Sequence, residues 1–514
     1  MSFRETSAPS STENLHPVAG PVRFHFQNTY ARLPERFYAR CTPTVVASPA
    51  LIKVNSGLAL RLGLDQHALG SAEGIEILAG NRQAEGAEPL AQAYAGHQFG
   101  YFVPQLGDGR ANLLGEVIGT DGARYDLQLK GSGPTPFSRR GDGRAALGPV
   151  LREYIVSEAM SALGVPTTRA LAAVTTGQGV YRETVQPGAV LCRVAASHLR
   201  VGTFQYFAAQ DDVEGVRLLT QYAIARHYPD AAQASRPTSA FLKGVIARQA
   251  KLVAQWMLLG FIHGVMNTDN TSISGETIDY GPCAFMEGYD PAQVFSSIDQ
   301  QGRYAYSNQP FAMQWNLTRL AECLLPLLAE EHGSQDAALA WAQGALSAFM
   351  PQFEAARREG FRRKLGLFSE QPGDAALAED LLTRMAEARV DFTALFRLLC
   401  AAASDPYADS SAAALFADPS SYDAWAAVWR HRLAQEDVQP EARAASMRLA
   451  NPVFIPRNHL VQEVIEAAVD KEDYQPFEQL LALVCCPYED NEAMAKFATP
   501  ALPEQRVHAT FCGT

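Results

Sequence analysis

The sequence lacks an apolar run long enough to cross a membrane. The best candidate, residues 252–265, is interrupted by Gln255 and His263, whereas a bilayer-spanning helix needs about 20 consecutive apolar residues. Residues 1–20 carry one arginine and no apolar block, so we expect a flexible tail there and not a secretory signal. These absences predict a cytoplasmic protein without a membrane partner.

Cysteine is sparse and irregularly spaced. The chain has 514 residues and eight cysteines, which argues against a disulfide framework. Cys485 and Cys486 are adjacent, but no histidine stands at ligand spacing from them, so a structural zinc site is not expected. Cys512 differs because a thiol so close to the end of the chain is expected to be mobile and accessible.

An excess of positive charge is also absent. The chain has 43 Lys and Arg against 55 Asp and Glu, for a net charge of −12, which opposes a broad electrostatic footprint on nucleic acid. We therefore expect no nucleic-acid partner, and any anionic ligand must be held by a local site. With 47% hydrophobic and 19% charged residues, the composition is typical of a globular chain of roughly two to four folding units.

Short apolar runs bounded by Gly and Asp predict β-structure between residues 100 and 130. Strands are expected at 113–118 and 125–130, joined by a Thr-Asp-Gly turn as a hairpin. The second strand alternates apolar residues with Asp126, Gln128 and Lys130, the period of two that a strand requires.

The pattern becomes helical after about residue 205. Pro149 opens a helix that ends near Leu163, and apolar spacing predicts a buried helix around 242–259, followed by Ala- and Leu-rich helices from about 310. We therefore predict an α+β fold with four parts, which are a flexible tail (1–20), a β-rich N-terminal lobe (21–205), an enlarged helical C-terminal lobe (206–500) and a tail that carries Cys512 (501–514).

Two features of the predicted N-terminal lobe are typical of nucleotide sites. Gly107, Gly109 and Arg110 precede a strand, where glycines allow the backbone to approach phosphate and arginine adds a cation; a tight β-turn explains the glycines about as well. Lys130 ends a strand and Glu153 lies on the following helix, a pair that positions nucleotide phosphates in kinase folds. Taken singly, Lys130 is typical of a solvated strand end.

The loop after the buried helix, HGVMNTDN, resembles the kinase catalytic loop H-R-D-x-x-x-x-N. His263 and Asn270 match the His and Asn of that loop, but Val265 stands at the position of the catalytic Asp, where the base is expected. Asp269 is the carboxylate that could take over as the base. Asp279 follows in Asp-Tyr-Gly, at the place of the kinase element that binds Mg²⁺, and with Asn270 it offers hard oxygen ligands. The order and spacing of these pieces predict a protein-kinase-like, two-lobed nucleotide fold that binds ATP with Mg²⁺ or Mn²⁺.

The valine at position 265 leaves three functions open. The chain is an ordinary γ-phosphoryl kinase, a catalytically inactive nucleotide-binding scaffold, or an enzyme that directs attack at a different phosphorus. Arg193 and Arg200 have no counterpart in the kinase motifs. They form either surface ion pairs worth about 0 to 1 kcal/mol each or a clamp on phosphate oxygens.

Four long segments resemble the selenoprotein O family, also called YdiU. They are YAGHQFGYFVPQLGDGRA (94–111), LQLKGSGPTPFSRRGDGRAALGPVLREY (127–154), NTDNTSISGETIDYGPCAF (267–285) and NPVFIPRNHLVQEVIEAA (451–468). The similarity runs from about residue 20 to the end. It implies a pseudokinase that binds ATP in a flipped orientation and transfers AMP to Ser, Thr or Tyr hydroxyls of other proteins, with a uridylyl donor left open.

The resemblance also implies the roles of individual residues, of which Asp142 and Gly143 rest on it alone. Gly107, Gly109, Arg110, Lys130, Asp142 and Gly143 would contact the nucleotide, Arg193 and Arg200 would hold the γ-phosphate, Glu153 would pair with Lys130, Asn270 and Asp279 would bind the metal, and Asp269 would accept the proton.

Cys512 takes the place where eukaryotic members of this family carry selenocysteine. Some bacterial members pair this cysteine with one near the activation segment, but the corresponding position here, near Phe295, is not a cysteine. Cys283 is the nearest alternative, so a redox-gating disulfide between Cys283 and Cys512 is a hypothesis. The competing interpretation is that Cys283 is a small buried hydrophobe.

Overall fold

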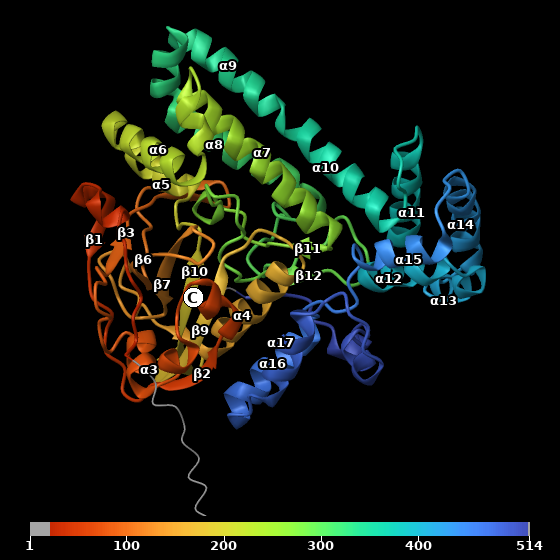
Figure 1. Cartoon of the computed structure of the whole chain (residues 1–514), viewed down its shortest axis with the longest axis horizontal. Coiled ribbons are helices and arrows are strands. Elements are labelled where there is room, and N and C mark those ends of the chain that lie inside the picture. Colours follow the sequence, from red (N-terminus) through yellow and green to blue (C-terminus); the bar gives the residue numbers. More distant parts are fainter. Residues whose placement is uncertain (1–20, 512–514) are drawn as a thin grey trace, which may run out of the picture.

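An antiparallel sheet forms the first part of the chain in the computed structural model, which describes residues 21–511 (Figure 1). The sheet has eight strands in the order β1-β3-β6-β7-β10-β9-β2, with β8 paired to β10. Its strands are β1 (Tyr38–Arg40), β2 (Ala50–Val54), β3 (Leu90–Gln92), β6 (Ala111–Ile118), β7 (Arg124–Lys130), β8 (Ala145–Ala146), β9 (Arg169–Tyr181) and β10 (Val185–Ala195). Two smaller antiparallel pairs lie outside it, β4 (Gly96–Gln98) with β5 (Tyr101–Val103) and β11 (Phe261–Ile262) with β12 (Ala284–Phe285).

The predicted hairpin is confirmed as β6 and β7, with Ala111 opposite Lys130 at one end and Ile118 opposite Arg124 at the other. The alternation in β7 gives one polar face, but in the structure this face is not exposed to solvent. Asp126 and Gln128 are buried, because helices cover both faces of the sheet. The polar face of β7 therefore points into the protein and supports the cavity described below.

Short helices cover one face of the sheet and α4 covers the other. Helices α1 (Ser56–Arg61), α2 (Gln66–Leu69) and α3 (Ala72–Ala79) pack against side chains of β6, β7, β9 and β10. Helix α4 (Leu147–Ala162) packs on β9 and β10 from the other side, together with α16 (Asn458–Lys471) and α17 (Gln475–Val484). It begins two residues before the predicted Pro149 and ends one residue before the predicted Leu163.

Helices dominate the chain after β10, so the predicted mixture of a sheet and many helices is confirmed. The buried helix expected around 242–259 is α7, which Figure 1 shows running beside α8 and α10. The helices are α5 (Val201–Ala208), α6 (Val213–His227), α7 (Pro237–Leu258), α8 (Gln309–His332), α9 (Gln335–Ser347), α10 (Phe349–Lys364), α11 (Asp374–Ala388), α12 (Phe392–Ala402), α13 (Asp409–Ala413), α14 (Pro419–Leu433), α15 (Pro440–Arg448), α16 (Asn458–Lys471) and α17 (Gln475–Val484).

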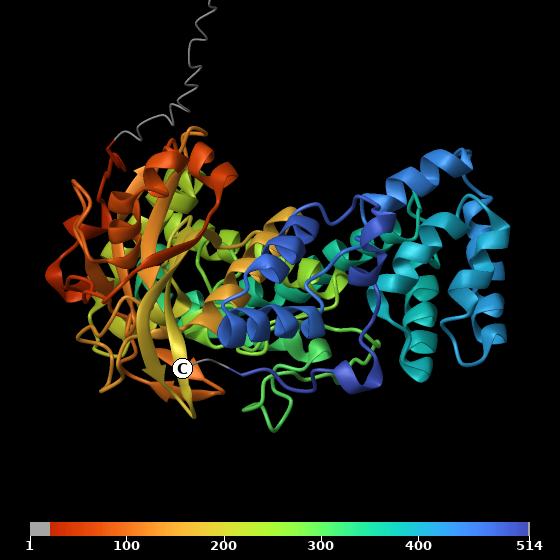
Figure 2. The same ribbon diagram turned by 90° about the horizontal axis from the view of Figure 1, so that it is seen from below.

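The last described residues, part of the dark blue chain in Figure 2, pack against segments on both sides of β12. Thr510 Oγ1 donates a hydrogen bond to Pro282 O at 2.6 Å, and Thr510 also pairs with Ser296 as an isolated bridge. Cys283 is buried, whereas Cys512 and the predicted tail 1–20 lie outside the described residues. Within residues 21–511, no helix combines the length and the apolar character that crossing a membrane requires.

Candidate active site

A cavity of about 510 Å³ opens between the sheet and the helical part of the chain. Its walls come from the segment before β6, the end of β7, the loop 137–144, the end of β10, the start of α5 and the loop after β11. Eleven of the twelve predicted site residues line it; Glu153 lies behind Lys130. The lining includes Gly107, Gly109, Arg110, Lys130, Asp142, Gly143, Arg193, Arg200, Asp269, Asn270 and Asp279.

Asp279 lies at the centre of three cations in the inner wall. Its Oδ1 accepts hydrogen bonds from Lys130 Nζ at 2.8 Å and Arg193 Nη1 at 2.6 Å, and its Oδ2 accepts one from Arg200 Nη1 at 2.9 Å. Burial by itself would raise the pKa of Asp279, but Arg193, Lys130 and Arg200 hold that pKa well below its usual range. The carboxylate is therefore ionised and fixed in place.

Glu153 of α4 provides the second carboxylate of this cluster. Lys130 Nζ lies 2.6 Å from Glu153 Oε2, and Arg193 Nη1 lies 3.2 Å from Glu153 Oε1. The side chain of Lys130 is 12% exposed and that of Arg193 is 3% exposed. Lys130 is therefore not a solvated strand end, and the interpretation of Arg193 as a surface ion pair is wrong, because both side chains are enclosed between the sheet and α4.

Arg200 joins the start of α5 to the loop that carries Asp269. Its Nη1 also donates to the backbone oxygen of Asp269 at 2.8 Å, and its guanidinium lies 4.6 Å from the centre of the Tyr94 ring. The Arg200 side chain is 3% exposed, so this residue is not a surface cation either. Two buried guanidinium groups thus face one cavity, an arrangement that suits oxygen-rich anions such as phosphates.

Two glycine positions allow the segments above the cavity, the 131–144 loop and the residues before β6, to pack closely. Gly107 has φ +70°, and a Cβ there would lie 2.2 Å from the Phe137 ring; Gly143 has φ +65°, and a Cβ would lie 2.1 Å from Gly133 C. A larger residue at position 107 would push the 131–144 loop off the segment before β6, and one at position 143 would force the two ends of that loop apart. Asp142, next to Gly143, accepts a hydrogen bond from Arg182 at 2.9 Å at the rim.

Asp269 and Asn270 present oxygen atoms to the same cavity. Asp269 Oδ2 accepts a hydrogen bond from Gln98 Nε2 at 3.1 Å, while its buried Oδ1 has no partner among the described residues. Burial raises the pKa of Asp269 to about 6, although the Gln98 hydrogen bond and Arg200 act in the opposite direction. Asn270 Nδ2 donates to Val265 O at 3.0 Å, which leaves the amide oxygen for a ligand.

The donor set fits a divalent cation held together with a nucleotide. Among residues 21–511, no cluster of three or more His, Cys, Asp or Glu side chains could hold a metal by itself. Asn270 and Asp279 supply one amide and one carboxylate in the same cavity. Mg²⁺ is commonly bound by one or two carboxylates while phosphates and waters complete its shell.

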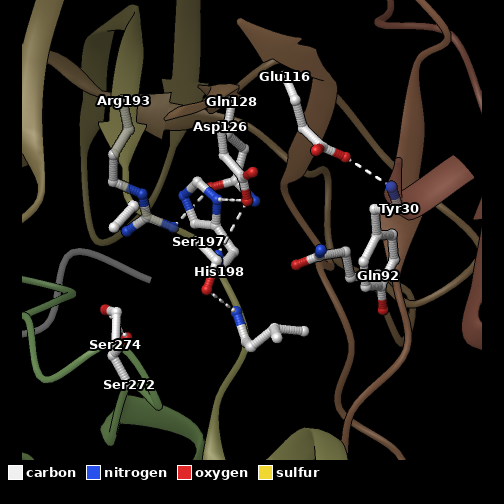
Figure 3. Close-up of polar contacts among 12 residues, drawn as sticks. Tyr30, Gln92, Glu116, Asp126, Gln128, Arg193, Ser197, His198, Ser272 and Ser274 are labelled. Carbon is white, nitrogen blue, oxygen red and sulfur yellow. Dashed lines mark hydrogen bonds and ion pairs between the residues drawn. The ribbon is translucent and has the colours of Figure 1, made fainter. Parts of the chain in front are cut away.

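A buried polar network supports this wall from behind (Figure 3). Gln128 Oε1 accepts from Arg193 Nη2 at 2.6 Å, and Gln128 Nε2 donates to Asp108 Oδ2 at 3.1 Å. Asp126 Oδ2 lies 3.0 Å from His198 Nδ1, and its Oδ1 lies 2.5 Å from Arg226 Nη2. Gln128 fixes the direction of Arg193 because Asp108 holds the Gln128 amide in place.

Sequence reasoning missed several residues of the cavity. Arg139, Arg144 and Arg182 also line it; the SRRGDGR segment has the density of arginine that could have indicated the first two. Gln98 is different, because its contact with Asp269 joins residues far apart in the chain and has no sequence signature.

Comparison with known proteins identifies relatives over nearly the whole chain. A family model described as "Protein adenylyltransferase SelO" matches residues 21–484. The "Protein nucleotidyltransferase YdiU" of Bradyrhizobium sp. (strain BTAi1 / ATCC BAA-1182) is 62% identical over 493 residues, covering 96% of this chain and 100% of that protein. The protein of the same name from Methylorubrum populi is 62% identical over 497 residues, covering 96% and 99%. The resemblance drawn from the four sequence segments is confirmed.

Proposed function

Because this chain belongs to the SelO family and is a nucleotidyltransferase, we propose that it transfers AMP from ATP to Ser, Thr or Tyr hydroxyls of cytoplasmic proteins. The triphosphate lies back to front in a protein-kinase-like cleft, so that the α-phosphorus faces the incoming hydroxyl. The observation that carries this proposal is the pair of buried guanidinium groups, Arg193 and Arg200, on the inner wall beside Asp279.

The two arginines bear on the orientation of the nucleotide. Each is fixed from behind, Arg193 by Gln128 and Glu153 and Arg200 by the backbone oxygen of Asp269. A planar guanidinium group binds two phosphate oxygens through paired hydrogen bonds. A γ-phosphate held there takes over hydrogen bonds that Asp279 accepts in the structure, and the α-phosphate is then left near Asn270. Glu153 orients Lys130, and Lys130 contacts the phosphate groups between the γ- and α-phosphates.

Proton transfer falls to Asp269. Its Oδ1 is buried in the cavity without a hydrogen-bond partner, so it can accept the proton of a hydroxyl that approaches the α-phosphorus. Gln98 holds the other oxygen in place. Asn270 and Asp279 would hold Mg²⁺ or Mn²⁺, which when bound offsets charge on the phosphate oxygens and the leaving pyrophosphate.

ATP labelled separately at the α and γ positions tests the proposal. We expect α-label, and no γ-label, to become covalently attached to acceptor proteins or to the chain itself in the presence of Mg²⁺. Asp269→Asn should lose transfer while Asp336→Asn, at an exposed position of α9, retains it. Transfer of γ-label would favour a γ-phosphoryl kinase. Nucleotide-dependent stabilisation without any labelling would favour an inactive scaffold.

A further inference from the structure

The β4–β5 hairpin is fixed to the loop that carries Asp269. His97 N donates to Thr268 Oγ1 at 2.6 Å, Phe99 N donates to Asn267 Oδ1 at 3.1 Å, and Gln98 contacts Asp269 itself. The turn residues Phe99 and Gly100 both have positive φ, +51° and +89°, as a tight two-residue hairpin turn requires. The outer surface of the hairpin is therefore held at a set place relative to the proposed proton acceptor.

Helix α8 is fixed to the same loop from the other side. Asn316 Nδ2 donates to Met266 O at 2.8 Å, and Gln309 Oε1 accepts from His263 N at 3.1 Å. Trp315 precedes Asn316 and projects toward the hairpin, where its ring lies edge-on to His97 with 5.1 Å between ring centres. The hairpin and the start of α8 thus form one continuous surface beside the cavity.

Two arginines stack on Trp315 in this surface. Arg303 Cζ lies 4.7 Å and Arg319 Cζ lies 4.9 Å from the centre of the indole ring. Phe102 completes the group through His97, with 4.9 Å between their ring centres. We call these five residues the Trp315 cluster. Stacking on an aromatic face orients a guanidinium while leaving its edge available for hydrogen bonds to a carboxylate.

The Trp315 cluster carries positive charge that the described residues neutralise only in part. Arg319 pairs with Glu322 at 2.8 Å on the same helix, and among residues 21–511 no ion pair is formed by Arg303. The nearby Asp299 carboxylate accepts backbone N–H groups of Arg303 and Tyr304. The Nε atoms of Arg303 and Arg319 are buried without a hydrogen-bond partner. In a chain of net charge −12, this is a local site for negative charge.

Exposed apolar side chains stand on the same segments as the Trp315 cluster. Tyr101 is 80% exposed, Phe311 is 61% exposed and Ile298 is 59% exposed; Phe311 lies one turn before Trp315 on α8. Ile298 also lines the cavity, together with Gln98 and Phe99. An aromatic and cationic surface therefore continues from the cavity mouth to the outside of the molecule.

We infer that the Trp315 cluster docks an acidic segment of the protein substrate, with Asp or Glu a few residues from the hydroxyl that is modified. This inference rests on the proposed function and adds the substrate class. Arg303 lies next to the cavity-lining end of the hairpin, because a Cβ added at Gly100, which follows Phe99, would lie 3.5 Å from Arg303 Cζ. An extended segment advances about 3.3 Å per residue, so a carboxylate on Arg303 and a hydroxyl in the cavity belong to one short stretch. The exposed apolar side chains contact the residues between them.

Fluorescent peptides with a single central serine test the inference in two ways. One peptide has Glu at the flanking positions, a second has Gln and a third has Lys. Binding is measured by fluorescence anisotropy with Mg²⁺ and an ATP analogue that cannot release pyrophosphate, and transfer is measured as kcat/KM for α-label. We expect the Glu peptide to exceed the Gln peptide about tenfold in both measurements and the Lys peptide to be the poorest.

Variants of the Trp315 cluster identify the residues responsible. Arg303→Gln and Arg319→Gln should each reduce the preference for Glu over Gln to about threefold or less. Arg303→Lys should give a preference between that of Arg303→Gln and that of the unaltered chain, because the charge remains but the stacked planar fork is lost. Arg363→Gln, a 68% exposed position on α10, is the matched control and should leave the preference unchanged. Thermal unfolding and the Kd for ATP verify that each variant is folded.

The outcomes separate the two proposals. Equal binding of the three peptides, preference for Lys, or an unchanged preference in both Gln variants would overturn the docking inference. Self-labelling with α-label together with equal peptide binding would refute docking alone. A preference for the Glu peptide that depends on Arg303, without α-label transfer to any acceptor, would support docking and refute the proposed function.

Discussion

Lys130 Nζ lies 2.8 Å from Asp279 Oδ1 and joins the end of β7 to the loop that follows β11. Because the same ammonium lies 2.6 Å from Glu153 Oε2, one lysine links a strand, helix α4 and the loop that offers metal ligands. These contacts place the candidate nucleotide site on a connection between the sheet and the helical part of the chain. Changes at this connection are expected to affect catalysis more than folding.

Replacing Lys130 by methionine should lower transfer of AMP at least about 100-fold, because the phosphates lose a charged contact while the aliphatic stem is kept. The change in melting temperature should be small, since Arg193 still pairs with both Glu153 and Asp279. Rates of α-label transfer and thermal unfolding are the measurements. Lys251→Met, at an exposed position of α7, serves as the control, and full activity of Lys130→Met would refute the assignment.

Gly143→Ala should weaken nucleotide binding and destabilise the loop above the cavity. The added Cβ would lie 2.1 Å from the Gly133 backbone, so the two ends of the 131–144 loop must separate. Gly122→Ala is a matched control, because Gly122 also has a positive φ of +77° but nothing lies within 4 Å of an added Cβ. The control should cost about 1 kcal/mol for the backbone conformation alone. ATP titrations and thermal unfolding compare the two, and equal behaviour would contradict the steric argument.

Gln98→Ala should reduce kcat for α-label transfer about tenfold while the KM for ATP stays close to that of the unaltered chain. Gln98 holds Asp269 Oδ2 at 3.1 Å, so its removal releases the proposed proton acceptor without removing a phosphate contact. Gln66→Ala, on the exposed surface at α2, is the comparison. A rise in KM with no change in kcat would assign Gln98 to nucleotide binding instead.

The buried Asp126 should make stability depend on pH in the acid range. Burial by itself would raise the pKa of Asp126, but Arg226 and His198 lower it to about 2, compared with about 3.9 in an unfolded chain. Its contribution is therefore fully present above about pH 4 and is lost as the pH falls toward 2. The size is roughly 3 kcal/mol, because the two pKa values differ by about 1.9 and one pKa unit corresponds to about 1.4 kcal/mol.

Urea unfolding of the unaltered chain and of Asp126→Asn between pH 6 and pH 3 measures this contribution. The difference in unfolding free energy between the two should shrink as the pH falls below about 4. Asp423→Asn, at an exposed position of α14, should show a small difference that does not change with pH. A difference for Asp126→Asn that stays constant down to pH 3 would mean that burial cancels the effect of Arg226 and His198 on its pKa.

Much of the site was predictable because its residues stand in short motifs with local causes. Lys130 ends an alternating strand, Glu153 lies on a helix opened by a proline, and Asn270 and Asp279 stand nine residues apart in one loop. Eleven of the twelve predicted residues line one cavity. The weaker predictions concerned charge, because a sequence does not show whether an arginine such as Arg193 is exposed or enclosed.

The sequence by itself determined the strand and helix periods, the motif order and the family, since these depend on neighbours in the chain and on side-chain type. Only the tertiary structure decided that three cations surround Asp279, that Gln98 holds Asp269, and that Arg303 and Arg319 stack on Trp315. The contacts of Asp279 and Asp269 join residues 79 to 171 positions apart. Arg303 and Arg319 stand only 12 and four residues from Trp315, but their stacking depends on side-chain directions. Packing fixes such directions, and no local pattern encodes them.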